Sequence, residues 1–149
     1  MDALDRELIK HLQEDARLSL RELGRILNVP HTTIFTRVNK LVDKGVIKKF
    51  SAILHSHDLG FKLNFVVIDS PAEGSDELIS SITKCGEVMK VFKTDDGKII
   101  VKAVSDEEGP NCLSNFLAKL GNHNMSVHPI DEVVKYDHSL HEEFIDLVE

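Results

Sequence analysis

The stretch VPHTTIFTRVNKLVDKGVIKK, residues 29–49, combines a regular apolar pattern with threonines and basic residues. Its apolar residues recur at helical spacing: Ile34, Val38, Leu41 and Val42. Pro30 stands just before this pattern, where proline is tolerated in a first helical turn, and Gly45 ends it. The stretch therefore predicts an amphipathic helix with one face in a core and a polar, basic face in solvent.

Two shorter helices are expected upstream. The first has leucines at helical spacing: Leu4, Leu8 and Leu12. The second opens at Ser19 and Glu22, whose types and spacing form a capping box. A short turn joins the second and third helices, which is the helix-turn-helix arrangement, and the later helix is the one that enters a DNA major groove. A strand-like stretch at 46–54 would follow as a wing.

The polar face of the third predicted helix carries groups suited to DNA. Counting 100° per residue places five side chains opposite the apolar stripe: Thr32, Thr36, Asn39, Lys40 and Asp43. Thr33 and Arg37 lie on one flank of this face and Phe35 on the other. Hydroxyl and amide groups read base edges, and cations hold phosphates. The candidate DNA contacts are Arg17, Arg21, His31, Thr32, Thr33, Phe35, Thr36, Arg37, Lys40, Lys48 and Lys49. Arg37 has an alternative role, because its flank position lets its stem pack against the helix pair.

Charge is unevenly distributed along the chain, whose formal net charge is −7. Residues 1–50 hold ten Lys/Arg against seven Asp/Glu, a net of +3, and residues 51–149 hold eight against eighteen, a net of −10. Within residues 17–50, eight bases accompany two acids, a net of +6. A basic face on a small helical unit is often simply solvated, but this concentration favours a polyanionic partner for the first half alone.

The second half of the chain has a different pattern. Four strands are predicted, at 63–68, 87–94, 98–104 and 126–136. Two helices are predicted, at 75–85 and 111–120. Asp95-Asp96-Gly97 is typical of a hairpin turn between the middle strands. The order βαββαβ predicts a ferredoxin-like sandwich, and the tail at 138–149 has the spacing of one more helix.

The fold class is therefore α+β, with an N-terminal winged helix-turn-helix and a C-terminal ferredoxin-like domain. We expect domains at 1–54 and 63–149, joined by a linker at 55–62. A four-stranded sheet with helices on one face leaves its other face bare, and such a face usually marks an interface. The bare face is predicted to include Val91, Lys93, Ile99, Val101, Val133 and Lys135. We therefore expect the protein to form a homodimer or a higher homo-oligomer.

Several other classes of protein are disfavoured. No apolar run approaches the roughly 20 residues of a membrane-spanning helix, and the acidic start resembles no signal peptide, so we expect a cytoplasmic protein without membrane contact. Cys85 and Cys112 are expected to stay reduced. The eight histidines, with a His55-Ser-His57 pair among them, form no zinc motif, so neither a metal nor another cofactor is expected. The common hydrolase, P-loop and dinucleotide motifs do not occur.

Residues 4–60 resemble the leucine-responsive, or Lrp/AsnC, family of transcriptional regulators. The shared features are Leu4-Asp5, the L-x-x-D-x-R of residues 12–17, Glu22-Leu23, the T-I-x-x-R-V of residues 33–38, Gly45-Val46-Ile47 and Leu59-Gly60. The resemblance implies sequence-specific binding of double-stranded DNA by a dimer or larger assembly, with a second domain that also senses small molecules. Pro30 departs from the family, which usually has a helix-capping serine at this position.

Two alternatives to a DNA-binding regulator remain open at this point. Siroheme decarboxylases resemble the same regulators, but their typical Ile-Arg-Arg-Ile-Gly run corresponds here to Ile47-Lys48-Lys49-Phe50-Ser51, and the basic helix face is intact. A ligand-binding scaffold that never meets DNA would leave the +6 segment unexplained. We therefore expect a regulator and not an enzyme.

The predicted effector turn departs from the family. Members of the family usually carry a Thr-Gly-x-x-Asp-like turn that helps to hold the charged ends of an amino acid. The corresponding residues here are Thr94, Asp95, Asp96, Gly97 and Lys98. The ammonium group of an amino acid would meet a lysine where the family has an acid, and a hairpin needs only Asp-Gly to turn. Weak or absent binding of amino acids is expected, and an anionic group beside Lys98 would suit the turn better.

Overall fold

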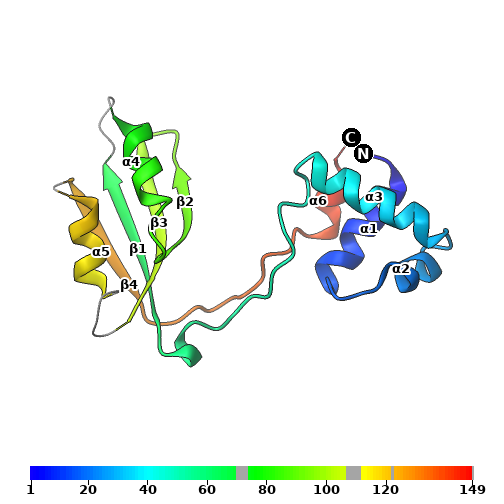
Figure 1. The fold of residues 1–149 in the computed structure, drawn as a ribbon, viewed down its shortest axis with the longest axis horizontal. Coiled ribbons are helices and arrows are strands. Elements are labelled where there is room, and N and C mark those ends of the chain that lie inside the picture. The colour runs from blue at the N-terminus through cyan, green and yellow to red at the C-terminus, as the bar shows by residue number, and fades with distance from the viewer. Residues whose placement is uncertain (70–73, 107–111, 122, 149) are drawn as a thin grey trace. The chain divides into compact units, whose positions relative to one another are not determined.

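A computed structural model of the chain describes residues 1–69, 74–106, 112–121 and 123–148 (Figure 1). The chain divides into two compact units. The first unit combines Met1–Ile53 with Tyr136–Glu149, and the second spans Leu54–Lys135. In the part of the chain that the structure describes, no helix is both long enough and apolar enough to cross a membrane.

Three helices form the front of the first unit: α1 (Ala3–Glu14), α2 (Leu20–Ile26) and α3 (His31–Asp43). The start of α1 is capped by Asp2, whose carboxylate accepts a hydrogen bond of 2.9 Å from the Asp5 N–H. The predicted capping box of α2 is confirmed. Ser19 N–H donates to Glu22 Oε2 at 2.8 Å, and Glu22 N–H donates to Ser19 Oγ at 3.2 Å. These caps satisfy amide groups that a helix leaves without partners at its start.

The turn between α2 and α3 depends on a close approach of two backbone segments. Val29 N–H donates to the Gly24 carbonyl at 2.9 Å, and Asn28 turns the chain with a φ of 54°. A Cβ atom at Gly24 would lie 2.7 Å from the Val29 carbonyl oxygen, a backbone atom that cannot move aside cheaply. Glycine at position 24 therefore permits the tight helix-turn-helix.

The core of the first unit takes one side chain or more from each of these helices. Leu8, Leu23, Ile34 and Leu41 are each at most 3% exposed. Leu8 belongs to α1, Leu23 to α2, and Ile34 and Leu41 to α3. Because Ile34 and Leu41 are fixed in the core, the rotation of α3 about its axis is fixed as well, and the opposite face of the helix is held in solvent.

The prediction of a strand at 46–54 is not borne out, since this segment has no regular secondary structure. A strand is stabilised by hydrogen bonds to a neighbouring strand, and no strand pairs with residues 46–54 in the described part of this chain. The segment begins instead by closing α3. The N–H groups of Val46 and Ile47 donate to the Leu41 carbonyl at 2.9 and 3.1 Å.

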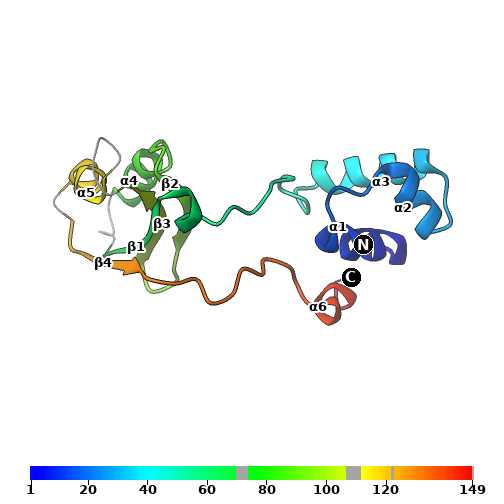
Figure 2. The same ribbon diagram turned by 90° about the horizontal axis from the view of Figure 1, so that it is seen from below.

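The C-terminal tail packs with the first unit, although the sequence assigned it to the domain at 63–149. Its helix α6 (Glu142–Asp146) is shorter than the expected 138–149 helix and lies beside α1 (Figure 2). Ile145 is 2% exposed. Gln13 Nε2 donates to the Leu140 carbonyl at 3.2 Å, and Leu140 N–H donates to Gln13 Oε1 at 2.8 Å. These contacts join positions more than 100 residues apart, which local sequence patterns do not reveal.

The second unit confirms the predicted βαββαβ order. Its elements are η1 (His57–Leu59), β1 (Lys62–Asp69), α4 (Ser75–Ile82), β2 (Val88–Lys93), β3 (Lys98–Ser105), α5 (Leu113–Leu120) and β4 (Met125–Ile130). The strands form one antiparallel sheet in the order β2-β3-β1-β4. The last strand ends at Ile130 and does not continue to 136 as predicted. The predicted start of the second helix at Asn111 lies outside the described residues.

Helices α4 and α5 cover one face of the sheet, and the core of the second unit lies between this face and the two helices (Figure 2). Val66, Ile99, Val101 and Phe116 are buried there, each at most 1% exposed. The prediction that Ile99 and Val101 belong to the bare face is therefore wrong, and Val91 also packs against this core. Val133 and Lys135 lie beyond the last strand. Strict alternation shows which residues share a face, but not which face meets the helices.

The open face of the sheet carries the other set of alternating residues. Register places Phe92, Ile100 and Val67 side by side in one row across three strands. Phe92 is 46% exposed. Phe65, in the neighbouring row, and Ile100 and Val67 are each partly exposed. This face mixes apolar and basic groups, as predicted, since Lys102 lies opposite Phe65, but it is made of different residues.

Candidate nucleic-acid interface

The solvent face of α3 gathers most of the predicted DNA contacts. His31, Thr32, Phe35, Thr36 and Lys40 are all exposed. Phe35 is 55% exposed, an unusual position for a large aromatic side chain in a helix whose other face is buried. Thr33 is half-buried on the flank of this face. An aromatic ring and hydroxyl groups together on an exposed helix are suited to contacts with thymine methyl groups and base edges.

Thr36 is held in a defined orientation at the centre of this face. Its Oγ1 donates to the Thr32 carbonyl one turn earlier, at 3.0 Å. This bond uses the hydroxyl proton and leaves the oxygen as an acceptor. The side chain therefore offers an acceptor and a methyl group to any partner that contacts the helix face. These are groups that distinguish bases in a major groove.

Arg37 lies on the flank of α3 and is engaged within the protein. Its guanidinium group donates to the Asp2 carboxylate and to Asp5 Oδ1, the latter at 3.2 Å. The pKa of Asp2 lies below its usual range, first because the Asp5 N–H bonds to the carboxylate and then because Arg37 does. The same contact raises the pKa of Arg37. Arg37 thus joins α3 to the start of α1, which agrees with the structural alternative that the sequence left open.

A second cationic region lies at the start of α3. Arg21, Arg25 and His31 line a hollow of about 530 Å³ beside Pro30. Pro30 supplies no side-chain cap, and the partial positive charge at a helix start adds to that of the arginines. Arg25 was not among the predicted contacts. Its position four residues after Arg21 on α2 was the signal that could have placed it there.

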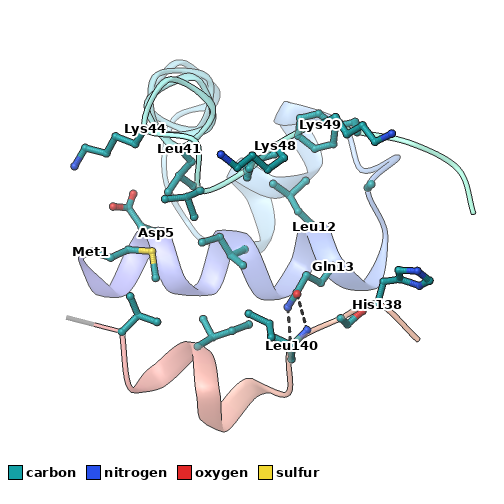
Figure 3. Close-up of a pocket in the computed structure, with 18 of the residues that line it drawn as sticks. Met1, Asp5, Leu12, Gln13, Leu41, Lys44, Lys48, Lys49, His138 and Leu140 are labelled. Atoms are coloured by element: carbon teal, nitrogen blue, oxygen red, sulfur yellow. Dashed lines mark hydrogen bonds between the residues drawn. The ribbon is translucent and has the colours of Figure 1, made fainter. Parts of the chain in front are cut away.

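Four lysines gather at the end of α3 and on the segment that follows it. Lys40, Lys44, Lys48 and Lys49 are exposed, and all four line one cavity of about 680 Å³ in the first unit. Figure 3 shows Lys44, Lys48 and Lys49 at this cavity. Among residues 1–69, 74–106, 112–121 and 123–148, none of the four forms a salt bridge. Lys40 acts on Asp2 only through its charge. Lys44 was not predicted to take part in binding.

Arg17 is exposed in the turn before α2, and its N–H donates to Asp15 Oδ1 at 2.8 Å. With Arg21 it adds cations beside the helix-turn-helix. All the predicted contacts therefore lie in the first unit. Arg37 differs from the others because its guanidinium group is already paired with Asp2 and Asp5. Helix α3 would supply base contacts, and the surrounding cations would supply phosphate contacts.

The predicted effector turn lies in the second unit and is closed by its own residues. Thr94 Oγ1 accepts from the Lys98 N–H at 2.9 Å, and Lys98 Nζ lies 3.2 Å from Asp96 Oδ2. The pKa of Asp96 is lowered, first by Thr94 and then by Lys98. Gly97 has a φ of 83°, which a hairpin turn of this kind requires of glycine. Asp96 and Lys98 thus neutralise each other before any ligand arrives.

The histidines form no metal centre in the described part of the chain, where no three metal-binding side chains come together. His55 Nδ1 lies 3.0 Å from Asp58 Oδ2, and its ring meets that of His57 edge-on at 6.4 Å. Both belong to the segment around η1. These contacts of His55 are therefore local, with residues two and three positions along the chain.

Comparison with known proteins agrees with this architecture. The profile of winged helix-turn-helix DNA-binding domains matches residues 1–48. The HTH-type transcriptional regulator FL11 of Pyrococcus horikoshii is 34% identical over 125 residues, which are 81% of this chain and 80% of that protein. The uncharacterised HTH-type transcriptional regulator PH0061 of the same organism is 36% identical over 145 residues, 92% of this chain and 97% of that protein.

Solved structures share the fold over nearly the whole chain. The crystal structure of PH0061 superposes with a TM-score of 0.82 and 34% identity, covering 92% of this chain and 97% of that chain. The leucine response regulatory protein LrpA of Mycobacterium tuberculosis has a TM-score of 0.82 at 21% identity, covering 94% of this chain and 99% of that chain. At that identity the second likeness supports the fold alone.

A winged helix-turn-helix followed by a βαββαβ unit defines the class of the molecule as a two-domain transcriptional regulator. The chain belongs to the Lrp/AsnC family of HTH-type transcriptional regulators. The relatives described above are named as regulators of transcription, which agrees with a non-enzyme and leaves the siroheme decarboxylase alternative without support.

Proposed function

We propose that this regulator binds double-stranded DNA in a sequence-specific manner through the solvent face of α3. The observation that carries the proposal is the exposed set of Thr32, Phe35 and Thr36 on a helix whose rotation is fixed by buried Ile34 and Leu41. Groups on a rigidly oriented helix can meet particular base edges, whereas a mobile face would give only charge attraction.

The cations around α3 are assigned to phosphates. Lys40, Lys48 and Lys49 flank the end of the helix, and Arg21 and Arg25 flank its start. These ammonium and guanidinium groups are exposed. Phosphate contacts of this kind position a helix in the groove without reading sequence. Arg37 is instead a positioning residue, because Asp2 and Asp5 already hold its guanidinium group.

The Thr36→Ala variant tests the assignment of base contacts. Replacing Thr36 removes an acceptor and a methyl group from an exposed position, so we expect the fold to be kept and the preference among DNA sequences to change by about 5- to 100-fold. Affinities for the fragments that the wild-type protein selects from genomic DNA, and for their single-base variants, measure this. Thr83→Ala removes an exposed threonine of the second unit whose hydroxyl also donates to a carbonyl of its own helix, so it is the matched control and should leave the ranking of sequences unchanged. An unchanged ranking of sequences in Thr36→Ala would refute the role of Thr36.

We further propose that the open face of the second unit forms a two-fold homodimer interface. Val67, Ile100 and Phe92 form a contiguous apolar row on β1, β3 and β2, with Phe65 in the next row. Contiguous apolar surface of this kind is rarely left in water by soluble monomers. A two-fold dimer carries two α3 helices, and helices of this kind read half-sites about 34 Å apart, or a multiple of that distance.

Substituting one residue of this row should dissociate the assembly. Ile100→Asp places a charge at the centre of the interface, where it would lose water without gaining a partner, so we expect a shift from dimer or larger to monomer at micromolar concentration. Light scattering measures the mass. Lys84→Asp, an exposed change in the turn after α4, should leave the mass unchanged. A wild-type protein that is already monomeric at this concentration would contradict the interface.

We also propose that amino acids are poor effectors at the turn between β2 and β3. The carboxylate of Asp96 already pairs with Lys98, and Thr94 bonds the Lys98 backbone, so an amino acid would have to break these contacts. We expect dissociation constants weaker than about 1 mM for aliphatic amino acids by calorimetry. A micromolar dissociation constant that is lost in Asp95→Ala or Asp96→Ala would show that the turn is an amino-acid site after all.

A further inference from the structure

The first unit contains a cavity that the proposed DNA contacts do not explain. It has a volume of about 680 Å³ and is lined by α1, by the end of α3 with the segment after it, and by the C-terminal tail (Figure 3). This volume lies within the range of about 300–1,000 Å³ that is usual for small-molecule sites. The cavity lies wholly within this unit, because its lining residues belong to 1–53 and 136–149.

The wall of the cavity is mostly apolar. Ile9 and Leu12 come from α1, Ile47 and Phe50 from the segment after α3, and Ile145 from α6. At its edge, large apolar side chains stay in contact with water: Phe50 is 51% exposed, Ile53 57% and Leu140 61%. Gln13 is a polar side chain of the wall, and both ends of its amide are bonded to the Leu140 backbone.

The lysines of the cavity lie along the side formed by the end of α3 and the segment after it (Figure 3). Lys40, Lys44, Lys48 and Lys49 all border it, and in the described part of the chain none is neutralised by a salt bridge. The one carboxylate among the lining residues, Asp5, is paired with Arg37. An apolar wall with uncompensated ammonium groups on one side is complementary to a molecule with a single negative charge and a hydrocarbon body.

We propose that this cavity binds an anionic amphiphile of the fatty-acid class, with its carboxylate among the four lysines and its unbranched chain along the wall formed by α1 and the tail. The binding itself does not depend on the proposed function. Its consequence does: Lys40, Lys48 and Lys49 are also assigned to DNA phosphates, so amphiphile and DNA compete for the same charges. Each ligand then weakens the binding of the other by the same factor.

Calorimetry with the full-length chain and the sodium salts of octanoate, decanoate and dodecanoate, each below its micelle concentration, tests the binding. Burial of the chain should tighten the affinity about fourfold for each added methylene. Dodecyltrimethylammonium, with the same tail and the opposite charge, should bind at least tenfold more weakly. Affinity independent of chain length, or equal affinity for the cationic amphiphile, would overturn the proposal.

Two exposed substitutions separate a site from general surfactant adsorption. Lys44→Gln should weaken dodecanoate binding by about three- to tenfold, and Phe50→Ser should reduce the gain for each methylene. Both positions are exposed and neither is assigned to DNA, so circular dichroism should show an intact fold. Lys84→Gln, on the second unit, is the matched control for loss of a charge and should leave the affinity unchanged. Equal affinity in Lys44→Gln, Phe50→Ser and Lys84→Gln would overturn the site.

Competition is measured as the apparent DNA affinity of the wild-type protein with and without saturating dodecanoate. We expect a decrease of at least tenfold with dodecanoate and none with dodecyltrimethylammonium. A dodecanoate-saturated protein that binds DNA as tightly as before would overturn the competition. DNA binding without any binding of dodecanoate would refute the cavity and leave the proposed function standing. Binding of dodecanoate by a protein that binds no DNA would refute the proposed function and leave the cavity site standing.

Discussion

The double variant Lys40→Ala/Lys48→Ala should bind every DNA sequence more weakly, by roughly 100-fold for each bound protomer at 50 mM salt. Both ammonium groups are exposed, and neither forms a salt bridge in the described part of the chain, so their removal should cost little stability. The loss follows from counterion release. Each phosphate contact contributes about 0.9 to the slope of log K against log salt, and two contacts contribute about 1.8.

Binding measured by fluorescence anisotropy between about 50 and 200 mM salt gives both the affinity and this slope. Lys84→Ala removes one exposed lysine from the second unit and should change neither quantity. The ranking of DNA sequences should stay the same in the double variant, because phosphates carry no sequence information. A double variant with the wild-type slope would show that these lysines do not contact phosphates.

Ile34→Ala and Phe35→Ala, at adjacent positions, should have opposite effects. Ile34 is fully buried where α3 meets α1 and α2, so its truncation should lower the free energy of unfolding of the first unit by about 2–5 kcal/mol. Phe35 is 55% exposed, so its truncation should change the free energy of unfolding by no more than about 0.5 kcal/mol. The second variant should nevertheless lose DNA affinity, since the exposed ring lies on the proposed reading face.

Urea unfolding followed by far-ultraviolet circular dichroism measures the first effect, because most of the described helical residues belong to the first unit. DNA affinity under conditions where both variants are folded measures the second. Equal stability of the two variants would contradict the orientation of α3. Wild-type affinity in Phe35→Ala would remove the ring from the reading face.

Features encoded by neighbouring residues could be read from the sequence. The Ser19–Glu22 capping box, the buried stripe of α3 and the Asp-Gly hairpin each depend on residues within one or two turns of chain, and each is present in the structure. The order of strands and helices followed from the same local patterns. The resemblance to the family added the function, which local patterns alone left open.

Features that depend on distant contacts could not be read. The tail docks on α1 through the Gln13–Leu140 pair, and nothing near Leu140 in the sequence specifies a partner 127 positions away. The buried face of the sheet was predicted wrongly for the same reason. Both Ile99 and its neighbour Ile100 are apolar, so the sequence does not show which of them faces the helices. The ion pairs of Arg37 with Asp2 and Asp5 could not be predicted either, because they join residues more than 30 positions apart.

Sequencing of the fragments that the wild-type protein retains from sheared genomic DNA, at about physiological salt, tests the central claim most directly. Sequence-specific reading by α3 predicts that the retained fragments share one motif, arranged as two related half-sites about 10 base pairs or a multiple of that apart. Retention of fragments in proportion to their abundance, with no shared motif, would contradict the claim and reduce the first unit to a surface that attracts DNA by charge alone.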